Sequence, residues 1–131
     1  MRNVILSLSL LFLISVAAQA VLGQKVTRIK FARGAAKATV SGSLSGYHGK
    51  RVYVIRVRSG QTLSTGQVGD RHDITIYIKD PNGEEVGDSD ASCNNRREIS
   101  PTVAGDYRIT VVECQKADAW RGSFRFRVTV R

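Results

Sequence analysis

Apolar and polar residues alternate strictly in two runs near the end of the chain, 107–112 and 123–131. A period of two is typical of a strand with one buried face and one solvated face. The two runs therefore predict two strands, which we expect to be neighbours in an antiparallel sheet. The residues on their buried faces are Tyr107, Ile109, Val111, Phe124, Phe126, Val128 and Val130.

Shorter runs of the same kind occur earlier in the chain. The expected strands are 26–31, 37–44, 51–58, a weak segment from Leu63 that fades at Gly66, and 73–79. The run 51–58 is apolar on both faces, which is typical of a central strand. Gly42 interrupts the second run, either as a bulge or as a place where another backbone comes close. No amphipathic helix is visible, so the chain is predicted to be all-β, a single antiparallel β-sandwich of about seven to eight strands.

Two polar segments separate these runs. Glycines flank Tyr47 in 45–50, which predicts a hairpin with an aromatic side chain at its tip. Residues 84–98 are rich in acids and are expected to form a solvated loop, with a small basic patch at 94–97. A calcium site at Asp88 and Asp90 is the alternative, but the full twelve-residue EF-hand pattern is absent.

The first twenty residues predict a secretory signal peptide. Arg2 gives a positive start, 4–16 is mostly apolar, and Ala18-Gln19-Ala20 is a suitable cleavage sequence. A retained membrane anchor is the alternative, and a cut near Gly23 is also compatible. With cleavage, residues 21–131 form one exported domain that is not inserted in the membrane.

The two cysteines, Cys93 and Cys114, both lie in this domain. In a small exported protein, such a pair is most simply one disulfide, and two free thiols are the alternative. The bond would close a loop of about 20 residues and stabilise the fold by roughly 3 kcal/mol. Neither cysteine lies in a zinc-binding pattern.

The formal net charge of +9 favours an anionic partner, although basicity also serves solubility alone. The export signal argues against nucleic acid as that partner. The histidines outside the signal, His48 and His72, lie beside turn signals and in no catalytic or metal-binding pattern. We therefore expect a binding protein without a cofactor or metal, rather than an enzyme.

Five segments, taken together and in order, carry a family resemblance. They are 30–34 (KFARG), 41–47 (SGSLSGY), 59–61 (SGQ), 104–111 (AGDYRITV) and 119–122 (AWRG). They resemble the periplasmic inhibitors of goose-type (g-type) lysozyme, which are themselves similar to pre-peptidase C-terminal β-sandwich domains. The resemblance implies a periplasmic protein that binds lysozyme and plugs its active-site cleft with loops from one end of the sandwich.

The resemblance also implies which residues form the plug. Tyr47 matches the tyrosine of the early hairpin, while Lys116 and Trp120 fall where the family commonly has two loop arginines. Arg121 is the adjacent cation, and Asp118 is expected to orient the loop. A cation there can form charge-assisted hydrogen bonds with the acids of a glycosidase cleft.

Three features depart from the family pattern: Ala104, where relatives carry serine, the replacement of the two loop arginines by Lys116 and Trp120, and the cysteine pair. Two alternatives also remain open. Trp120 could simply cover the open end of the core. The whole domain could instead be an accessory β-sandwich that binds cell-wall glycan or another anionic surface.

Overall fold

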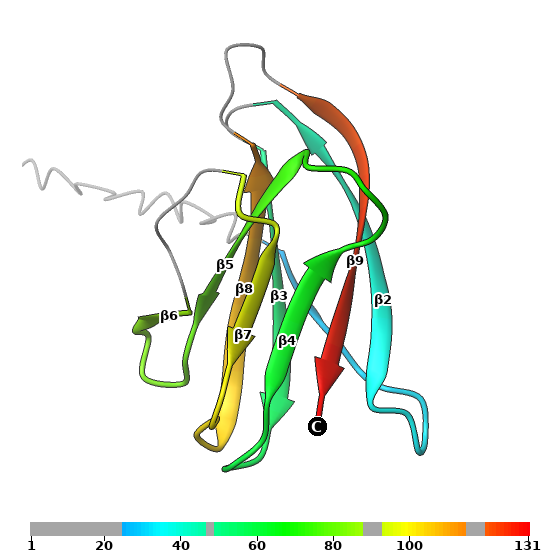
Figure 1. Ribbon diagram of the computed structural model, residues 1–131. Helices are drawn as coiled ribbons and strands as arrows, with labels where there is room; N and C mark the ends of the chain where they lie inside the picture. Colours follow the sequence, from blue (N-terminus) through cyan, green and yellow to red (C-terminus); the bar gives the residue numbers. More distant parts are fainter. Residues whose placement is uncertain (1–24, 47–48, 88–92, 115–119) are drawn as a thin grey trace, which may run out of the picture.

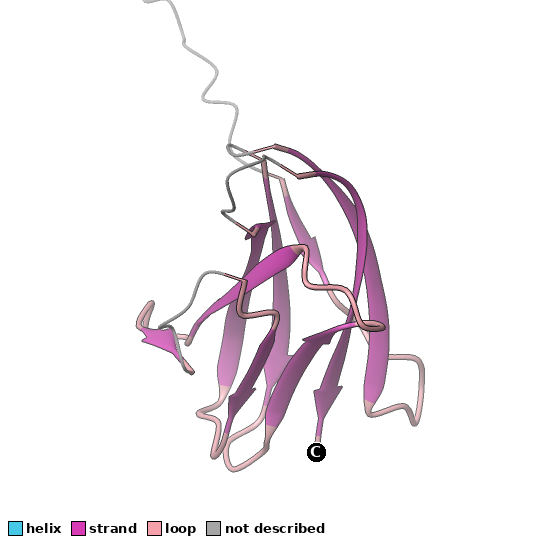
Figure 2. Ribbon diagram, turned by 45° about the horizontal axis from the view of Figure 1, so that its top comes forward, coloured by secondary structure: helices cyan, strands magenta, loops and turns pink. Residues whose placement is uncertain are grey.

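The computed structural model describes residues 25–46, 49–87, 93–114 and 120–131. The strands of this part of the chain form two facing sheets (Figures 1 and 2). They are β1 (Val26–Arg28), β2 (Lys37–Ser45), β3 (Lys50–Val57), β4 (Leu63–Gln67), β5 (Ile74–Lys79), β6 (Glu85–Val86), β7 (Arg96–Ile99), β8 (Gly105–Glu113) and β9 (Arg121–Val130). The prediction of an all-β sandwich is confirmed.

One sheet has the strand order β1-β3-β8-β5-β6 and the other has the order β2-β9-β4-β7. Every pair of neighbouring strands is antiparallel except β1 and β3, which run in parallel. The expected central position of β3 is confirmed, because β3 lies between β1 and β8 and is buried on both faces over Val52–Ile55. No helix that could span a membrane occurs within the described ranges.

The core lies between the sheets and is built from the alternating apolar positions. Nine of these side chains are at most 2% exposed: Ile74, Ile76, Ile78, Tyr107, Ile109, Val111, Phe124, Phe126 and Val128. Full burial of one such side chain stabilises the fold by about 1.5–3 kcal/mol. The predicted buried faces of β8 and β9 are therefore confirmed, and β5 shows the same alternation.

The expectation that 107–112 and 123–131 form neighbouring strands is wrong. β8 pairs with β3 and β5, whereas β9 pairs with β2 and β4 in the other sheet. The expected hairpin at 45–50 is wrong for the same reason, since this segment joins β2 of one sheet to β3 of the other. Alternation identifies the buried face of a strand, but in a sandwich both sheets present such a face to the same core.

Residues 84–98 contain two strands, β6 and β7, where a solvated loop was expected. Arg97 is 4% exposed, donates from Nε to the Ile76 carbonyl at 2.6 Å, and lies 5.8 Å from the centre of the Tyr77 ring. Because its side chain is buried, Arg97 does not contribute to the exposed basic patch predicted at 94–97. Asp88 and Asp90 of the calcium alternative lie outside the described residues, which hold no cluster suited to a metal ion.

The short strand β1 is tied to the sheet by side chains as well as by its backbone. Arg28 donates to both carboxylate oxygens of Asp106, at 3.1 and 2.9 Å. These hydrogen bonds lower the pKa of Asp106. The contribution of the ion pair is therefore present at neutral pH and is lost as pH falls through the lowered pKa.

Gly42 lies in the middle of β2, and the structure has no space for a side-chain methyl group at this position. A Cβ atom there would lie 2.5 Å from both Phe124 Cζ and Tyr53 Oη. The pairing of β2 with β9 runs through this position without interruption. Neither a bulge nor a nearby backbone therefore explains this glycine; two side chains occupy the space beside it.

We expect Gly42→Ala to lower the free energy of unfolding by about 1–3 kcal/mol, because the added methyl group overpacks the core. A gain of about 0.4–1 kcal/mol from the stiffer unfolded chain opposes this loss without cancelling it. Urea unfolding followed by circular dichroism measures the difference. Ser43→Ala, at the next and exposed position, is the control and should change stability by less than about 0.5 kcal/mol. Equal stability of the two variants would contradict the close contact.

Candidate functional site

Four strands end together at one end of the sandwich, at the top of Figure 1. Ser45 of β2 faces Arg121 of β9 in one sheet, and Lys50 of β3 faces Val112 of β8 in the other. The segments 46–49 and 114–120 connect the sheets at this end, which we call the loop end. The strand ends that bound the two predicted binding segments therefore lie side by side.

Two of the five predicted lysozyme-binding residues can be placed. Trp120 is half-buried and packs against the core, and Arg121 is exposed at the first position of β9. Tyr47, Lys116 and Asp118 lie outside the described residues. The alternative in which Trp120 covers the open end of the core agrees with its packing, but its remaining exposure leaves part of the side chain available to a partner.

The last residue of β8 forms a hydrogen bond with the backbone of Trp120. The backbone N–H of Trp120 donates to Oε2 of Glu113 at 3.2 Å, so this carboxylate links the last residue of β8 to the residue before β9. Glu113 is fully buried, and within the described part of the chain its Oε1 has no hydrogen-bond partner. A Cβ atom on Gly122 would lie 3.0 Å from Trp120 Cζ2, so glycine at 122 leaves room for the indole ring.

A second cation, Arg71, accompanies Trp120 at the loop end. Its guanidinium carbon lies 6.0 Å from the centre of the indole ring, within reach of a cation–π interaction. Asp73 Oδ2 accepts from Arg71 Nε at 2.6 Å and fixes the guanidinium. The sequence did not identify Arg71, because it lies in a weakly patterned segment and its proximity to Trp120 arises only from the fold.

Buried amides hold the backbone around Arg71. Asn95 Nδ2 donates to the Arg71 carbonyl at 2.8 Å, and it also lies 3.2 Å from Gln67 Oε1. The same oxygen of Gln67 accepts from the Asp73 backbone at 3.2 Å. Since Gln67 and Asn95 are both buried, these bonds give the segment that carries Arg71 a rigid base.

The predicted disulfide between Cys93 and Cys114 is present, with a Cα–Cα distance of 4.6 Å. It joins the end of β8 to the segment before β7. The backbone N–H of Cys114 donates to the Asp73 carbonyl at 2.8 Å, and that of Cys93 donates to Thr75 Oγ1 at 2.7 Å. Thr75 is buried on the face of β5 opposite Ile74 and Ile76, and this second bond satisfies its hydroxyl group. The disulfide thus stabilises the end of β8, where Glu113 holds the backbone of Trp120.

The chemistry of the loop end suits recognition. Among its described residues, cations and one half-buried indole face outward, whereas the acids Glu113 and Asp73 are engaged in hydrogen bonds within the protein. His72 lies 3.2 Å from the Asn95 amide and is not placed beside a nucleophile. A partner with acidic groups beside an apolar or sugar-binding surface would complement this end.

No protein-family model matches the sequence, and no curated protein sequence does so. Solved structures do match. Aeromonas hydrophila PliG, a periplasmic inhibitor of g-type lysozyme, matches with a TM-score of 0.63 at 19% identity, over 83% of this chain and 100% of that one. Salmonella Typhimurium PliG gives a TM-score of 0.61 at 17% identity, with the same coverage.

A third similar structure is the pre-peptidase C-terminal domain of a Bacillus anthracis collagenase, with a TM-score of 0.51 at 18% identity. It covers 83% of this chain and 97% of that domain. The chain therefore has the fold shared by the periplasmic inhibitors of g-type lysozyme and the pre-peptidase C-terminal domain.

Proposed function

We propose that this protein is a periplasmic inhibitor of lysozyme, directed at the g-type enzymes, and that its loop end enters the active-site cleft. One observation carries the proposal: two connections between the sheets leave from the same end, beside the half-buried Trp120 and the cations Arg71 and Arg121. The fold shared with inhibitors of g-type lysozyme supports it further. Tyr47, Lys116 and Asp118, which the sequence assigns to these connections, complete the proposed surface.

Inhibition of this kind needs no chemistry from the inhibitor. A glycosidase cleft presents carboxylates to its sugar substrate. Lys116 and Arg121 would form charge-assisted hydrogen bonds with such carboxylates, and Arg71 would add to the positive potential. The exposed part of Trp120 would occupy a position otherwise taken by a sugar ring, as aromatic anchors do in other interfaces. Burial of the rest of the indole fixes its orientation before binding, which lowers the entropy lost on association.

The test is a lysis assay with the mature domain. A g-type lysozyme is mixed with the protein, and clearing of a peptidoglycan suspension is followed, with c-type and i-type lysozymes run in parallel. We expect arrest of the g-type reaction alone at near-equimolar protein. Arrest of another type would contradict the g-type assignment, and arrest of none would contradict lysozyme inhibition.

Charge reversal tests the assigned surface. We expect Lys116→Glu combined with Arg121→Glu to weaken inhibition at least about tenfold, because like charges would then face each other across the interface. The matched control is Arg58→Glu with Arg131→Glu, which changes the net charge equally at exposed positions directly after β3 and β9, whose last residues lie at the opposite end. Equal inhibition by the two double variants would contradict the assignment of the loop end.

The second candidate function is binding of cell-wall glycan, supported by the similarity to the pre-peptidase domain and by the net positive charge. It predicts that the protein sediments with purified peptidoglycan and is released by salt. A lysozyme inhibitor should instead remain in the supernatant of that assay and should bind folded lysozyme.

A further inference from the structure

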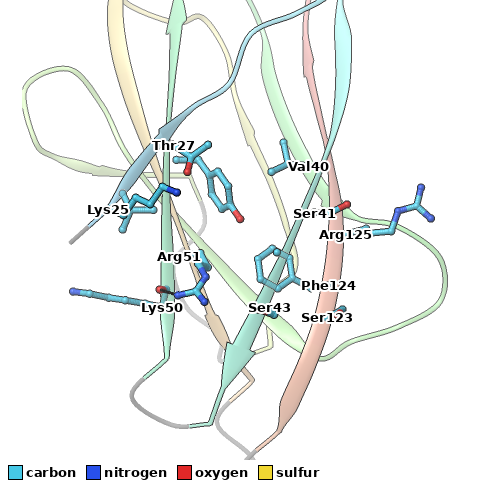
Figure 3. A pocket seen from close by; sticks show the side chains of 13 residues that line it. Lys25, Thr27, Val40, Ser41, Ser43, Lys50, Arg51, Ser123, Phe124 and Arg125 are labelled. Atoms are coloured by element: carbon cyan, nitrogen blue, oxygen red, sulfur yellow. Dashed lines mark hydrogen bonds between the residues drawn. The ribbon is translucent and has the colours of Figure 1, made fainter.

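A hollow of about 780 Å³ lies along the side of the sandwich, between the edges of the two sheets. β1 and β3 form one wall, and β2 and β9 form the other (Figure 3). Its volume falls within the range of about 300–1,000 Å³ that is usual for small-molecule sites. Two cations on the wall formed by β1 and β3, Lys25 and Arg51, line it, and none of its described lining residues is an acid. The hollow is therefore positive.

Its floor contains the hydroxyl group of a tyrosine, Tyr53. Tyr53 is 4% exposed, and its ring packs edge-to-face on Phe126 at 5.3 Å. Its Oη reaches across to β2, where the missing side chain of Gly42 makes room for it. Within the described ranges this hydroxyl forms no hydrogen bond with protein atoms. The oxygen keeps contact with solvent, so it can donate to a ligand in the hollow that accepts a hydrogen bond.

Arg51 stands beside this hydroxyl. It lies two positions before Tyr53 on β3 and so points to the same side of the strand, into the space between the sheets. Burial raises the pKa of Tyr53, and the charge of Arg51 partly offsets this effect. The hydroxyl therefore remains a protonated donor at neutral pH.

The third donor is Lys25, directly before β1, whose side chain lies on the same wall of the hollow as Arg51 in Figure 3. Neither Lys25 nor Arg51 forms an ion pair with any carboxylate that the structure describes. Arg51 donates one hydrogen bond within the protein, from Nη1 to the Lys50 carbonyl at 3.3 Å. The remaining guanidinium donors can therefore serve a ligand.

The side chains of this site supply donors almost exclusively. A guanidinium, an ammonium and a phenol are joined by the hydroxyl of Thr27, and no described lining residue is a carboxylate. A phosphate group has two negative charges and several acceptor oxygens, and it matches two cations and a neutral donor better than a carboxylate does.

We propose that this hollow binds a phosphate-bearing ligand, with Arg51, Lys25 and the Tyr53 hydroxyl contacting the phosphate. Apolar groups of Val40 and Phe124 line the hollow and contact the carbon skeleton. This site lies along the side of the sandwich and does not depend on lysozyme inhibition at the loop end. Binding of phosphate can therefore succeed or fail independently of that function.

Calorimetric titration of the mature protein tests the ligand class. The probes are inorganic phosphate, glucose 6-phosphate and, as the uncharged match, glucose; vesicles of phosphatidylcholine with and without phosphatidic acid test a lipid source. Saturable binding of glucose 6-phosphate without binding of glucose supports a soluble ligand. Binding only to vesicles that contain phosphatidic acid supports a lipid headgroup. Binding of no phosphate probe, or equal binding of glucose, would overturn the proposal.

Variants then test the residues, with whichever phosphate probe binds. Arg51→Gln should weaken binding about tenfold, and Tyr53→Phe about threefold or more, because each loses a donor to the phosphate. Arg58→Gln is the matched control: it removes the same charge from an exposed position just after β3, outside the hollow, and should change binding less than about twofold. Arg51 is itself exposed, so its loss should leave the circular dichroism spectrum unchanged. Equal weakening by Arg51→Gln and Arg58→Gln would mean attraction by net charge alone and would overturn the site.

Discussion

Replacing Phe126 with alanine is expected to lower the free energy of unfolding by about 3–5 kcal/mol. Phe126 is fully buried in the middle of β9. Its ring lies 5.3 Å from that of Tyr53 in the opposite sheet and 6.2 Å from that of Phe124 in its own. Removing it therefore takes away buried apolar area and two aromatic contacts, and it leaves a cavity between the sheets that the strands close only in part.

Urea unfolding of the mature domain measures this loss. The control is Arg127→Ala, on the same strand but exposed, which should change stability by less than about 0.5 kcal/mol. A domain of this size is stable by only about 5–15 kcal/mol, so Phe126→Leu provides a milder variant, with an expected loss of about 1–2 kcal/mol. Similar stability of Phe126→Leu and Arg127→Ala would contradict the central role of this ring.

Reducing the disulfide is expected to destabilise the domain by roughly 3 kcal/mol. The bond joins Cys93 to Cys114, 21 residues apart, and its main effect in the chain-entropy account is to restrict the unfolded chain. Cys114 is 2% exposed at the end of β8, so the bond fixes a buried position. Urea unfolding with and without dithiothreitol measures the effect without changing any side chain other than the two sulfurs.

The control for reduction is the double variant Cys93→Ala and Cys114→Ala. It should unfold at the same urea concentration with and without dithiothreitol, because it has no bond to reduce. The natural protein should show a clear decrease in the unfolding midpoint. An unchanged midpoint for the natural protein would contradict a stabilising role for the bond.

The pattern of the sequence predicted which side chains are buried better than it predicted how the strands pair. Ile76, Ile109 and Phe126 lie in the core as their alternation indicates. The assignment of β8 and β9 to one sheet was wrong, because two facing sheets share one core and their inward residues look alike. β7 was missed because its sequence is charged, and the burial of Arg97 depends on a carbonyl and a ring supplied by β5.

The candidate site could be predicted from sequence only in part. Trp120 and Arg121 were found through family resemblance, and the structure places both at the loop end. Arg71 and Glu113 were not identified, although each interacts with Trp120. Their contacts join positions 49 and 7 residues apart through folded backbone, and no local pattern marks such pairs.

Both connections at the loop end join strands of opposite sheets. The side chains of the core therefore set the distance between the strand ends that each connection joins. Ser45 and Arg121 are held by one sheet, while Lys50 and Glu113 are held by the other. Packed sheets lie about 10 Å apart, and that separation follows the size of the side chains between them. A substitution at a core position such as Phe126 would therefore change the width of the loop end without altering any residue there. Substitutions in the core would in this way change the affinity for a rigid partner.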